Sequence, residues 1–253
     1  MKVFATFNIK GGVGKTASTI NLAYLSSLDG ARTLIWDLDP QSSATFYLRV
    51  KAKIKGGSKV LMRGKQELDP LIRGSDFDNL DLIPADFSYR KLDLLLDRTK
   101  KPTKRLAQLI RPLAREYDHL FLDCAPGITL VSESVFVASD VLMIPTIPTT
   151  LSLRTLDQLA KHLKKRRLKH LRICPFYCMV DRRKTLHREI AGSNDNAPFD
   201  LLATRIPFSS VVERMGIHRA PLHTYAGSSP AAQAYALLWD EIKIRLNSTY
   251  SNS

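Results

Sequence analysis

A glycine-rich loop near the N-terminus constrains the fold of this chain more than any other feature. It joins an apolar run typical of a buried strand to an amphipathic run typical of a helix, and it reads Lys10-Gly11-Gly12-Val13-Gly14-Lys15-Thr16. In that context glycines let backbone N–H groups turn toward phosphates, and the positive end of the new helix faces them. Lys15 then reaches the β- and γ-phosphates of a nucleotide, and the Thr16 hydroxyl ligates Mg²⁺.

The loop departs at its start from the common phosphate-binding pattern G-x-x-x-x-G-K-[ST]. Ile9 stands in the first glycine position, and an additional lysine, Lys10, follows it. The same letters can occur by chance in a glycine-rich linker, but a linker does not lie between a strand and a helix. We therefore predict ATP and Mg²⁺ as cofactors. Nucleotide contacts are expected from Lys10, Gly11, Gly12, Val13, Gly14, Lys15, Thr16 and Ala17.

Short apolar runs alternate with helix-like segments, which predicts an α/β fold with a mostly parallel twisted sheet flanked by helices on both faces. Strands are expected at Val3–Phe7, Thr33–Asp37, Leu80–Ile83, His119–Asp123, Val141–Pro145 and Arg172–Val180, with a last short strand at Leu202–Ile206. Helices are expected at Thr16–Leu28, Lys101–Glu116, Leu130–Ala138, Leu153–Leu168 and Pro230–Leu246. We interpret residues 49–79 as a surface excursion and 192–200 as a loop. The 253 residues are enough for a single P-loop ATPase domain over 1–247, followed by a frayed polar tail over 248–253.

Composition indicates a protein of the cytoplasm. No apolar run approaches the length that spans a bilayer, and the N-terminal residues lack the pattern of a signal peptide. Cys124, Cys174 and Cys178 have no second pair and no histidine at zinc-site spacing, so we expect reduced cysteines in the core.

Four segments, in order, resemble the ParA/MinD family of positioning ATPases with a deviant Walker A motif. They are the glycine-rich loop, Trp36-Asp37-Leu38-Asp39-Pro40-Gln41, Phe121-Leu122-Asp123-Cys124-Ala125-Pro126-Gly127, and Thr204-Arg205-Ile206-Pro207 with Ser229-Pro230-Ala231 and Ala234-Tyr235 beyond it. The resemblance spans almost the whole chain. It is closest to ParA/Soj-type partition proteins that lack an N-terminal DNA-recognition domain.

The resemblance implies a role for each residue of the motifs. Lys10 is similar to the signature lysine that reaches the partner's ATP across a homodimer in which two ATP molecules are sandwiched. Lys10, Lys15 and Asp39 would be catalytic, with Asp39 orienting the attacking water. Thr16, Asp37 and Asp123 would serve Mg²⁺, with Asp123 as the Walker B carboxylate. The plainer alternative for any aspartate after a strand is a helix cap or a turn residue.

The resemblance places the adenine near Pro207 and Phe208, with Asp181 as a further candidate. An arginine often follows that proline in the family, so Phe208 is a departure. Its ring either stacks on adenine or packs in the core, and the sequence leaves both interpretations open.

The excess of positive charge is the unusual feature of the composition. The chain carries 38 Lys and Arg against 24 Asp and Glu, a net charge of +14. Twelve of the basic residues lie between Arg154 and Glu189, where only three acidic residues oppose them. We expect non-specific binding of double-stranded DNA, although a charge run can also be a solvated face. The candidate contacts are Lys164, Lys165, Arg166, Arg167, Arg182, Arg183, Lys184, Arg214 and Arg219. The segment Val180–Thr185 resembles a family segment whose arginine contacts DNA, whereas Val211 stands where a second such arginine is expected.

These features predict an ATP-dependent dimerising switch. It would bind the nucleoid non-specifically and position a plasmid, a chromosome or a large protein complex, while an adaptor protein stimulates slow ATP hydrolysis. The main alternative is a MinD-like membrane-cycling ATPase, which needs an amphipathic C-terminal anchor that the sequence does not show, so no membrane partner is expected. An iron–sulfur or other metabolic enzyme on the same scaffold, and a scaffold with a dead ATP site, are further alternatives.

Overall fold

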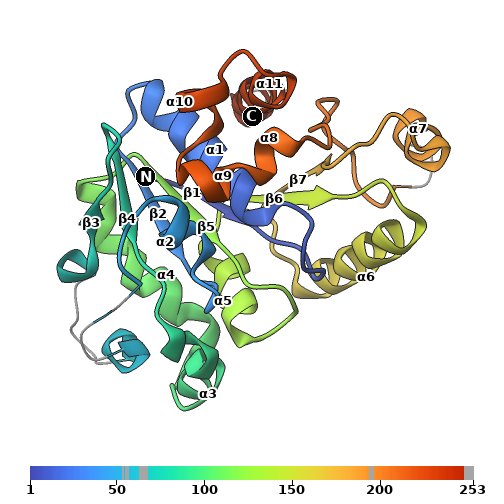
Figure 1. Ribbon diagram of the computed structural model, residues 1–253. Helices are drawn as coiled ribbons and strands as arrows, with labels where there is room; N and C mark the ends of the chain where they lie inside the picture. The colour runs from blue at the N-terminus through green and yellow to red at the C-terminus, as the bar shows by residue number, and fades with distance from the viewer. Residues whose placement is uncertain (53, 55–56, 63–67, 194–196, 248–253) are drawn as a thin grey trace.

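A twisted sheet forms the centre of the molecule (Figure 1). The computed structural model describes residues 1–52, 54, 57–62, 68–193 and 197–247. Within these residues the sheet has seven strands in the order β3-β4-β2-β5-β1-β6-β7. Their bounds are β1 Lys2–Thr6, β2 Thr33–Asp37, β3 Arg73–Gly74, β4 Leu80–Ile83, β5 His119–Asp123, β6 Val141–Thr146 and β7 Arg172–Tyr177. The strand β3 pairs antiparallel with β4, and every other pairing is parallel.

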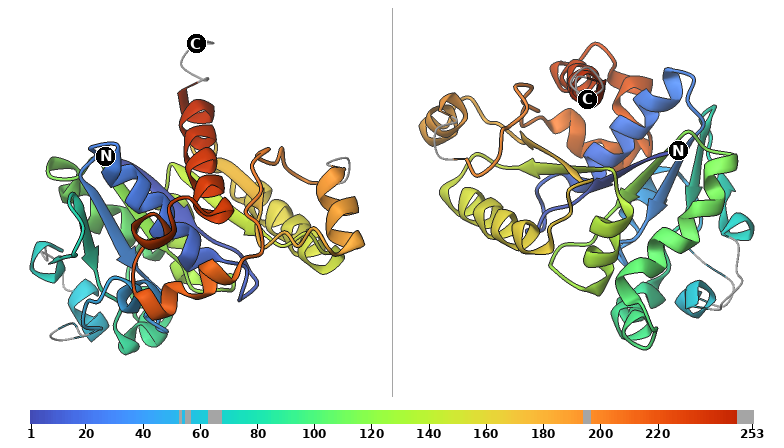
Figure 2. Two further views of the ribbon diagram at one scale, coloured as in Figure 1. Left: turned by 45° about the horizontal axis from the view of Figure 1, so that its top comes forward. Right: turned by 180° about the vertical axis from the view of Figure 1, so that it is seen from behind.

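Helices cover both faces of the sheet, as the alternating pattern predicts (Figure 2). One face carries α1 Lys15–Leu28, α2 Ser43–Tyr47, α8 Ser210–Glu213, α9 Met215–His218, α10 Leu222–Ala226 and α11 Pro230–Asn247. The other carries α3 Leu92–Asp97, α4 Arg105–Ile110, α5 Leu130–Ala138 and α6 Thr150–Arg166. The helix α7, Thr185–Gly192, lies beyond the edge strand β7. Since parallel strands require crossover helices, this arrangement follows from the strand order.

The predicted strands of the sheet centre are confirmed. The structure gives β2, β4 and β5 the predicted bounds, because each is an apolar run buried on both faces. On the α1 face, Phe4 of β1 stacks on Phe121 of β5 at 4.8 Å between ring centroids, and Trp239 of α11 contacts both rings. This aromatic cluster fastens the last helix to the two central strands.

The prediction of one helix over Lys101–Glu116 is wrong. The segment forms a 3₁₀ turn at Pro102–Lys104, the short helix α4, and a second 3₁₀ turn at Arg111–Arg115. Pro112 has no N–H to donate to the helical ladder, and its ring crowds the preceding turn. The α-helix therefore ends at Ile110.

The predicted strand at Leu202–Ile206 is also absent. This segment runs beside β7, where the Leu202 N–H donates to the Pro175 carbonyl at 2.8 Å and the Ile206 N–H to the Tyr177 carbonyl at 2.9 Å. Pro175 lies in the edge strand without an N–H of its own, so no continuous ladder can form. One isolated bridge, between Val180 and Pro207, remains, and β7 ends three residues before the predicted Val180.

Residues 49–79 are more than a surface excursion, since Ile54, Leu61, Leu68 and Leu71 are buried in the core. The predicted loop over 192–200 begins at Gly192, the last residue of α7, and residues 194–196 lie outside the described part. The predicted tail over 248–253 lies outside it too. Among the described residues, no helix is both long and apolar enough to cross a bilayer.

We expect Phe121→Ala to lower the free energy of unfolding by about 3–5 kcal/mol, because a fully buried ring is removed and the stack with Phe4 is lost. Urea denaturation without nucleotide measures the change. Leu237→Ala, at a side chain that is 62% exposed on α11, is the control and should change stability by less than about 0.5 kcal/mol. Equal losses in the two variants would contradict the assignment of Phe121 to the core.

Candidate nucleotide and magnesium site

The glycine-rich loop leaves the carboxyl end of β1 and enters α1, so it lies where ligands bind in open α/β sheets. Gly14 precedes the helix at a φ of 91°, and a Cβ placed on it would lie 2.8 Å from the Cys178 sulfur. Gly12 also has a positive φ, of 70°. Both positions therefore favour glycine because of their backbone conformation. The first N–H groups of α1 have no partner within the helix and are available to an anion bound in the loop.

Lys15 closes the loop from inside. Its ammonium nitrogen donates to the Lys10 carbonyl at 2.9 Å, and the Lys10 N–H donates to the Asn8 side-chain oxygen at 2.9 Å. The Asn8 amide in turn donates to the Pro145 carbonyl of β6. Burial lowers the pKa of Lys15, and the nearby carboxylates of Asp123 and Asp39 partly offset this effect. The ammonium thus stands between the loop and the acidic residues of the neighbouring strands.

Three polar side chains form a row at the carboxyl edge of the sheet. Thr6, Asp123 and Asp37 are register partners on β1, β5 and β2, and all three are fully buried. The Asp123 Oδ1 accepts from the Thr19 hydroxyl at 3.2 Å, whereas its Oδ2 has no hydrogen-bond partner in the part of the chain that the structure describes. Burial, and then the charge of Asp37, raise the pKa of Asp123 well above its ordinary value, while the Thr16 and Thr19 hydroxyls oppose the rise.

Asp37 is held by the turn that follows β2. Its Oδ2 accepts from the Thr45 N–H at 2.9 Å and from the Thr45 hydroxyl at 2.7 Å, and its Oδ1 accepts from the Asp39 N–H. Burial raises the pKa of Asp37 to about 6, although these hydrogen bonds stabilise the charged form. Asp39 itself is half-buried, and its Oδ1 accepts from the Gln41 N–H at 2.9 Å. Asp37 therefore positions the segment that carries Asp39.

The donor set fits magnesium. Protein-bound Mg²⁺ takes one or two carboxylates together with phosphate oxygens and water. The Asp123 Oδ2 is a buried acceptor with no hydrogen-bond partner among the described residues, and the Thr16 hydroxyl is close enough to this carboxyl to oppose the rise in its pKa. In the described ranges no group of three or more His, Cys, Asp or Glu side chains could hold a metal by itself, which suits an ion that is bound together with a nucleotide. Thr16 and Asp123 would hold it, and Asp37 would support them.

Sequence reasoning missed three residues that shape this site: Asn8, Thr19 and Thr45. Asn8 orients Lys10, Thr19 holds Asp123, and Thr45 holds Asp37 while its hydroxyl also accepts from the Ala85 N–H. Thr19 could have been found, since it lies one helical turn beyond Lys15 on the same face of α1. Nothing local in the sequence distinguishes Asn8 or Thr45.

The adenine candidates lie together beside the edge strand. Pro207 bridges Val180, and the Phe208 N–H donates to the Val180 carbonyl at 3.0 Å. The interpretation in which Phe208 packs in the core is wrong, because the residue is 45% exposed. Asp181 accepts from the Arg183 backbone and guanidinium, which lowers the pKa of its carboxyl to about 2.

The structure divides the DNA-contact candidates among three places. Lys164, Lys165, Arg166 and Arg167 end α6, beside the start of β7. Arg182, Arg183 and Lys184 follow β7 at the opposite, nucleotide-side edge. Arg214 and Arg219 lie on the other face of the sheet, next to α8 and α9. Since α6 has 17 residues at 1.5 Å each, the first two groups lie at opposite ends of a helix roughly 25 Å long.

Three of these candidate side chains already contact other residues of the chain. The Arg166 guanidinium pairs with the buried Glu133, Arg183 pairs with Asp181 at 2.9 Å, and Arg219 lies over the Phe46 ring at 4.5 Å. The remaining candidates are exposed and have no side-chain ion pair among the described residues. They are Lys164, Lys165, Arg167, Arg182, Lys184 and Arg214.

The three cysteines are buried and free, which confirms the expectation of core cysteines. Burial raises the pKa of each thiol, and at Cys124 the adjacent Asp123 carboxylate adds to the effect. Their chemistry is therefore that of small apolar side chains.

We expect Asp123→Asn to stabilise the protein without nucleotide and to weaken Mg²⁺-dependent ATP binding about tenfold or more. The folded state holds a proton on Asp123 more tightly than the unfolded state does, so wild-type stability falls as the carboxyl loses that proton. The stability advantage of the variant should thus grow as the pH rises above about 4, where the unfolded state loses the proton that the folded state keeps. Urea denaturation in EDTA measures stability, and titration with labelled ATP measures binding.

Asp118→Asn is the matched control for this experiment. Arg32 lowers the pKa of Asp118 to about 2, so the ionised carboxyl of Asp118 stabilises the folded state. Its removal should therefore bring no gain in stability at any pH above about 4. If Asp123→Asn behaved like Asp118→Asn, the buried carboxylate would already be compensated within the chain.

Comparison with known proteins identifies the family of this chain. A family model described as an AAA domain matches residues 1–173. A ParA family protein of Chlamydia muridarum is 27% identical over 96% of this chain and 97% of its own length. The sporulation initiation inhibitor protein Soj of Bacillus subtilis is 28% identical over 95% and 98%.

Solved structures share the fold. Cobyrinic acid a,c-diamide synthase of Mycobacterium smegmatis with bound ADP and magnesium superposes with a TM-score of 0.84 at 23% identity, over 98% of this chain and 96% of that one. The match over most of the sequence and the arrangement of the loop, Lys15 and Asp123 lead to one conclusion. The chain belongs to the ParA/MinD family of P-loop ATPases, whose nucleotide is ATP and whose metal is Mg²⁺.

Proposed function

We propose that this ATPase is a dimerising switch that binds DNA without sequence preference when it holds ATP. The dimer would distribute a cargo over the nucleoid in the cytoplasm, whether a plasmid, a chromosome or a large protein complex. An adaptor protein would stimulate slow hydrolysis and so release the DNA. Membership of a family of positioning ATPases supports the general role, and the exposed basic side chains beside the nucleotide edge carry the specific proposal.

The glycine-rich loop supports dimerisation. The backbone of Lys10 is anchored on both sides, yet its ammonium has no hydrogen bond or ion pair with any residue that the structure describes. Gly11 is exposed, and a Cβ there would meet nothing within 4 Å. The isolated fold therefore does not require glycine at position 11 or a lysine at position 10. Close approach of nucleotide and a second subunit would require both, with Lys10 contacting the partner's ATP.

The cations at the start of α7 support DNA binding. Arg182 and Lys184 are exposed and follow β7 at the same edge of the sheet as the nucleotide loop. A dimer formed through that edge would bring two copies of this segment together, and two weak patches joined in one particle bind far more tightly than either alone. ATP would thus control DNA affinity through dimerisation. The groups at Lys164–Arg167 and at Arg214 would extend the contact or serve other partners.

The membrane-cycling alternative lacks support from the last helix. The cations of α11 are engaged within the fold, since the Lys243 ammonium pairs with Asp29 at 2.7 Å and with Asp240 at 2.9 Å, and Arg245 pairs with Asp200. Leu237 and Ile244 are exposed on α11, but Asp240 lies between them in the sequence. This surface offers an anionic bilayer no free positive charge.

We expect Lys10→Ala to retain ATP binding and to lose ATP-dependent dimerisation, because its ammonium makes no contact within the chain. Analytical ultracentrifugation with a slowly hydrolysed ATP analogue and Mg²⁺ measures association. Lys15→Ala is the contrasting variant and should lose ATP binding itself, since Lys15 lies inside the loop. An unchanged dimer in Lys10→Ala would exclude the role across the interface.

We expect random duplex DNA to bind in Mg·ATP and not in Mg·ADP, with an affinity that falls steeply with salt. Replacing Arg182 and Lys184 together by glutamine should reduce the slope of log K against log salt by about 2 for each subunit, at about 0.9 for each phosphate contact. Fluorescence anisotropy over a salt series measures this. The control replaces the exposed Lys100 and Lys101 by glutamine, which removes the same charge elsewhere.

If both double variants lost the same affinity, net charge rather than a defined surface would explain the binding. If DNA failed to bind in every nucleotide state while anionic vesicles bound in Mg·ATP, the membrane-cycling function would replace the proposed one.

A further inference from the structure

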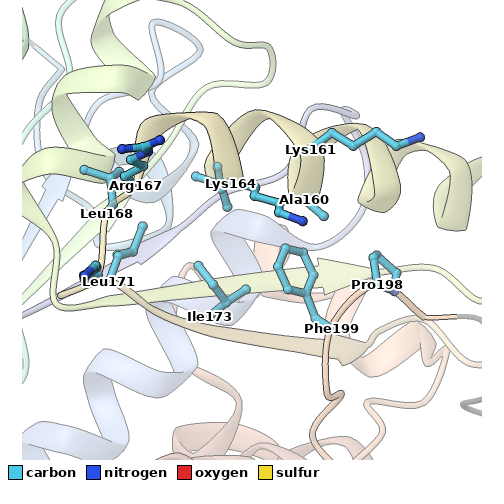
Figure 3. Close-up of a pocket in the computed structure, with 11 residues that line it drawn as sticks. Ala160, Lys161, Lys164, Arg167, Leu168, Leu171, Ile173, Pro198 and Phe199 are labelled. Atoms are coloured by element: carbon cyan, nitrogen blue, oxygen red, sulfur yellow. The ribbon is translucent and has the colours of Figure 1, made fainter.

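A hollow of about 400 Å³ lies between α6 and the first half of β7, at the end of the strand opposite the nucleotide site (Figure 3). Its walls are the inner side of α6, residues 168–173, and the segment that carries Pro198 and Phe199. A volume of this size is within the range of ligand pockets. It arises because Ala160 presents a small side chain to the hollow opposite the ring of Phe199.

The floor of the hollow is apolar. It is formed by Leu163, Leu171, Ile173 and Phe199. Leu163 and Leu171 belong to the core, whereas Ile173 and Phe199 are only partly buried and pack against it. The hollow is therefore a surface where one more apolar side chain could extend the core of the protein.

The rim is cationic. Lys161, Lys164, Arg167 and Lys169 line the hollow, and no carboxylate does among the lining residues. Lys161 pairs with Asp157 at 2.7 Å along α6, but the other three have no ion pair with a described residue. Cations at a helix C-terminus also favour the helix dipole, which explains charge there but explains no apolar floor beneath it.

The backbone conformation of Arg167 is an independent indication that its side chain has a role at the rim. It ends α6 with a φ of 53°, a left-handed conformation in which glycine is the favoured residue and an arginine is strained. Its backbone makes the usual cap, donating to the Lys164 carbonyl. Glycine would make the same cap with less strain. The helix end therefore does not require an arginine side chain at this position.

These features favour one class of ligand. A DNA backbone would pair with the rim but gain nothing from the apolar floor. We propose that the hollow between α6 and β7 docks an acidic peptide segment of a partner protein, which inserts one large apolar side chain over Phe199 and Ile173 while its carboxylates pair with Lys164, Arg167 and Lys169. The site is separate from the ATP site and does not depend on the DNA-binding proposal.

A fluorescein-labelled peptide, Glu-Asp-Glu-Phe-Glu-Asp-Glu, tests the proposal on the full chain by anisotropy at physiological salt. It should bind at least about tenfold more tightly than the same peptide with Ser in place of Phe, because a buried aromatic side chain contributes that much. A peptide with Gln in place of every acid should not bind. In amide NMR spectra, the shifts should be concentrated at Ile173 and Phe199.

Two variants of the protein test the location. Ala160→Phe fills the hollow and should lower peptide affinity about tenfold or more, whereas Gln158→Phe adds the same ring on the exposed side of α6 and should leave it unchanged. Arg167→Gly should weaken binding about threefold or more while the protein remains at least as stable, since it relieves the left-handed arginine. Unchanged ATP binding and a melting temperature no lower than that of the wild type confirm that each variant is folded.

The proposal is overturned by any of three results. In the first, the Phe and Ser peptides bind equally, so the surface attracts anions without using its apolar floor. In the second, none of the peptides binds with a Kd below 1 mM. In the third, the binding of phosphatidylglycerol vesicles or duplex DNA, rather than of the peptide, is weakened by the Ala160 and Arg167 variants. Should Ala160→Phe fail to fold, Arg167→Gly and the peptide series decide the question.

Discussion

Two carboxylates buried side by side on adjacent strands are the constraint on which the site depends. Asp37 and Asp123 are register partners with no solvent exposure, and burying like charges together is costly unless cations or hydrogen bonds compensate them. Within the chain, Lys15 and a few hydroxyl and amide groups provide part of that compensation. The Asp123 Oδ2 is left without compensation, since it has no hydrogen-bond partner among the described residues. Ionisation of both carboxyls is therefore unfavourable in the fold alone. A bound Mg²⁺ would favour it, which would couple the stability of the protein to ligand binding.

The same carboxylate pair organises the chain beyond the sheet. Asp37 holds Thr45, and the Thr45 hydroxyl accepts from the Ala85 N–H, so α2 is fixed to the turn after β4. The far end of α2 is joined to α9 by Arg219, whose guanidinium donates to the Phe46 carbonyl and lies over its ring. Arg219 is thus a structural link between the acidic edge and the C-terminal helices. Its guanidinium is already engaged with Phe46, which leaves it less available to a DNA phosphate.

Much of this could be predicted from the sequence, and the failures have physical causes. The central strands and the glycine-rich loop are readable because each is a local pattern, an apolar run or a required backbone conformation. Pro112 and Pro175 carry local signals that the apolar patterns around them outweighed. Because each lacks an N–H, Pro112 ends an α-helix and Pro175 prevents a continuous ladder between β7 and residues 202–206. The buried parts of 49–79 could not be found, because their apolar residues follow neither strand nor helix periodicity. Asn8 and Thr45 act through contacts with distant segments, which no local pattern records.

The basic cluster shows most clearly what the sequence leaves undetermined. Residues 154–189 form one charged region in the sequence, but α6 and β7 run in opposite directions and carry its two ends apart. At one end, Arg182 and Lys184 lie at the carboxyl edge of the sheet, which also carries the glycine-rich loop. At the other, Lys164 and Arg167 surround an apolar hollow on the opposite edge. A single polyanion lying along one face would need neither the hollow nor the separation. Two surfaces of the same charge, one on the edge of the glycine-rich loop and one remote from it, would allow one subunit to hold both proposed anionic partners at once.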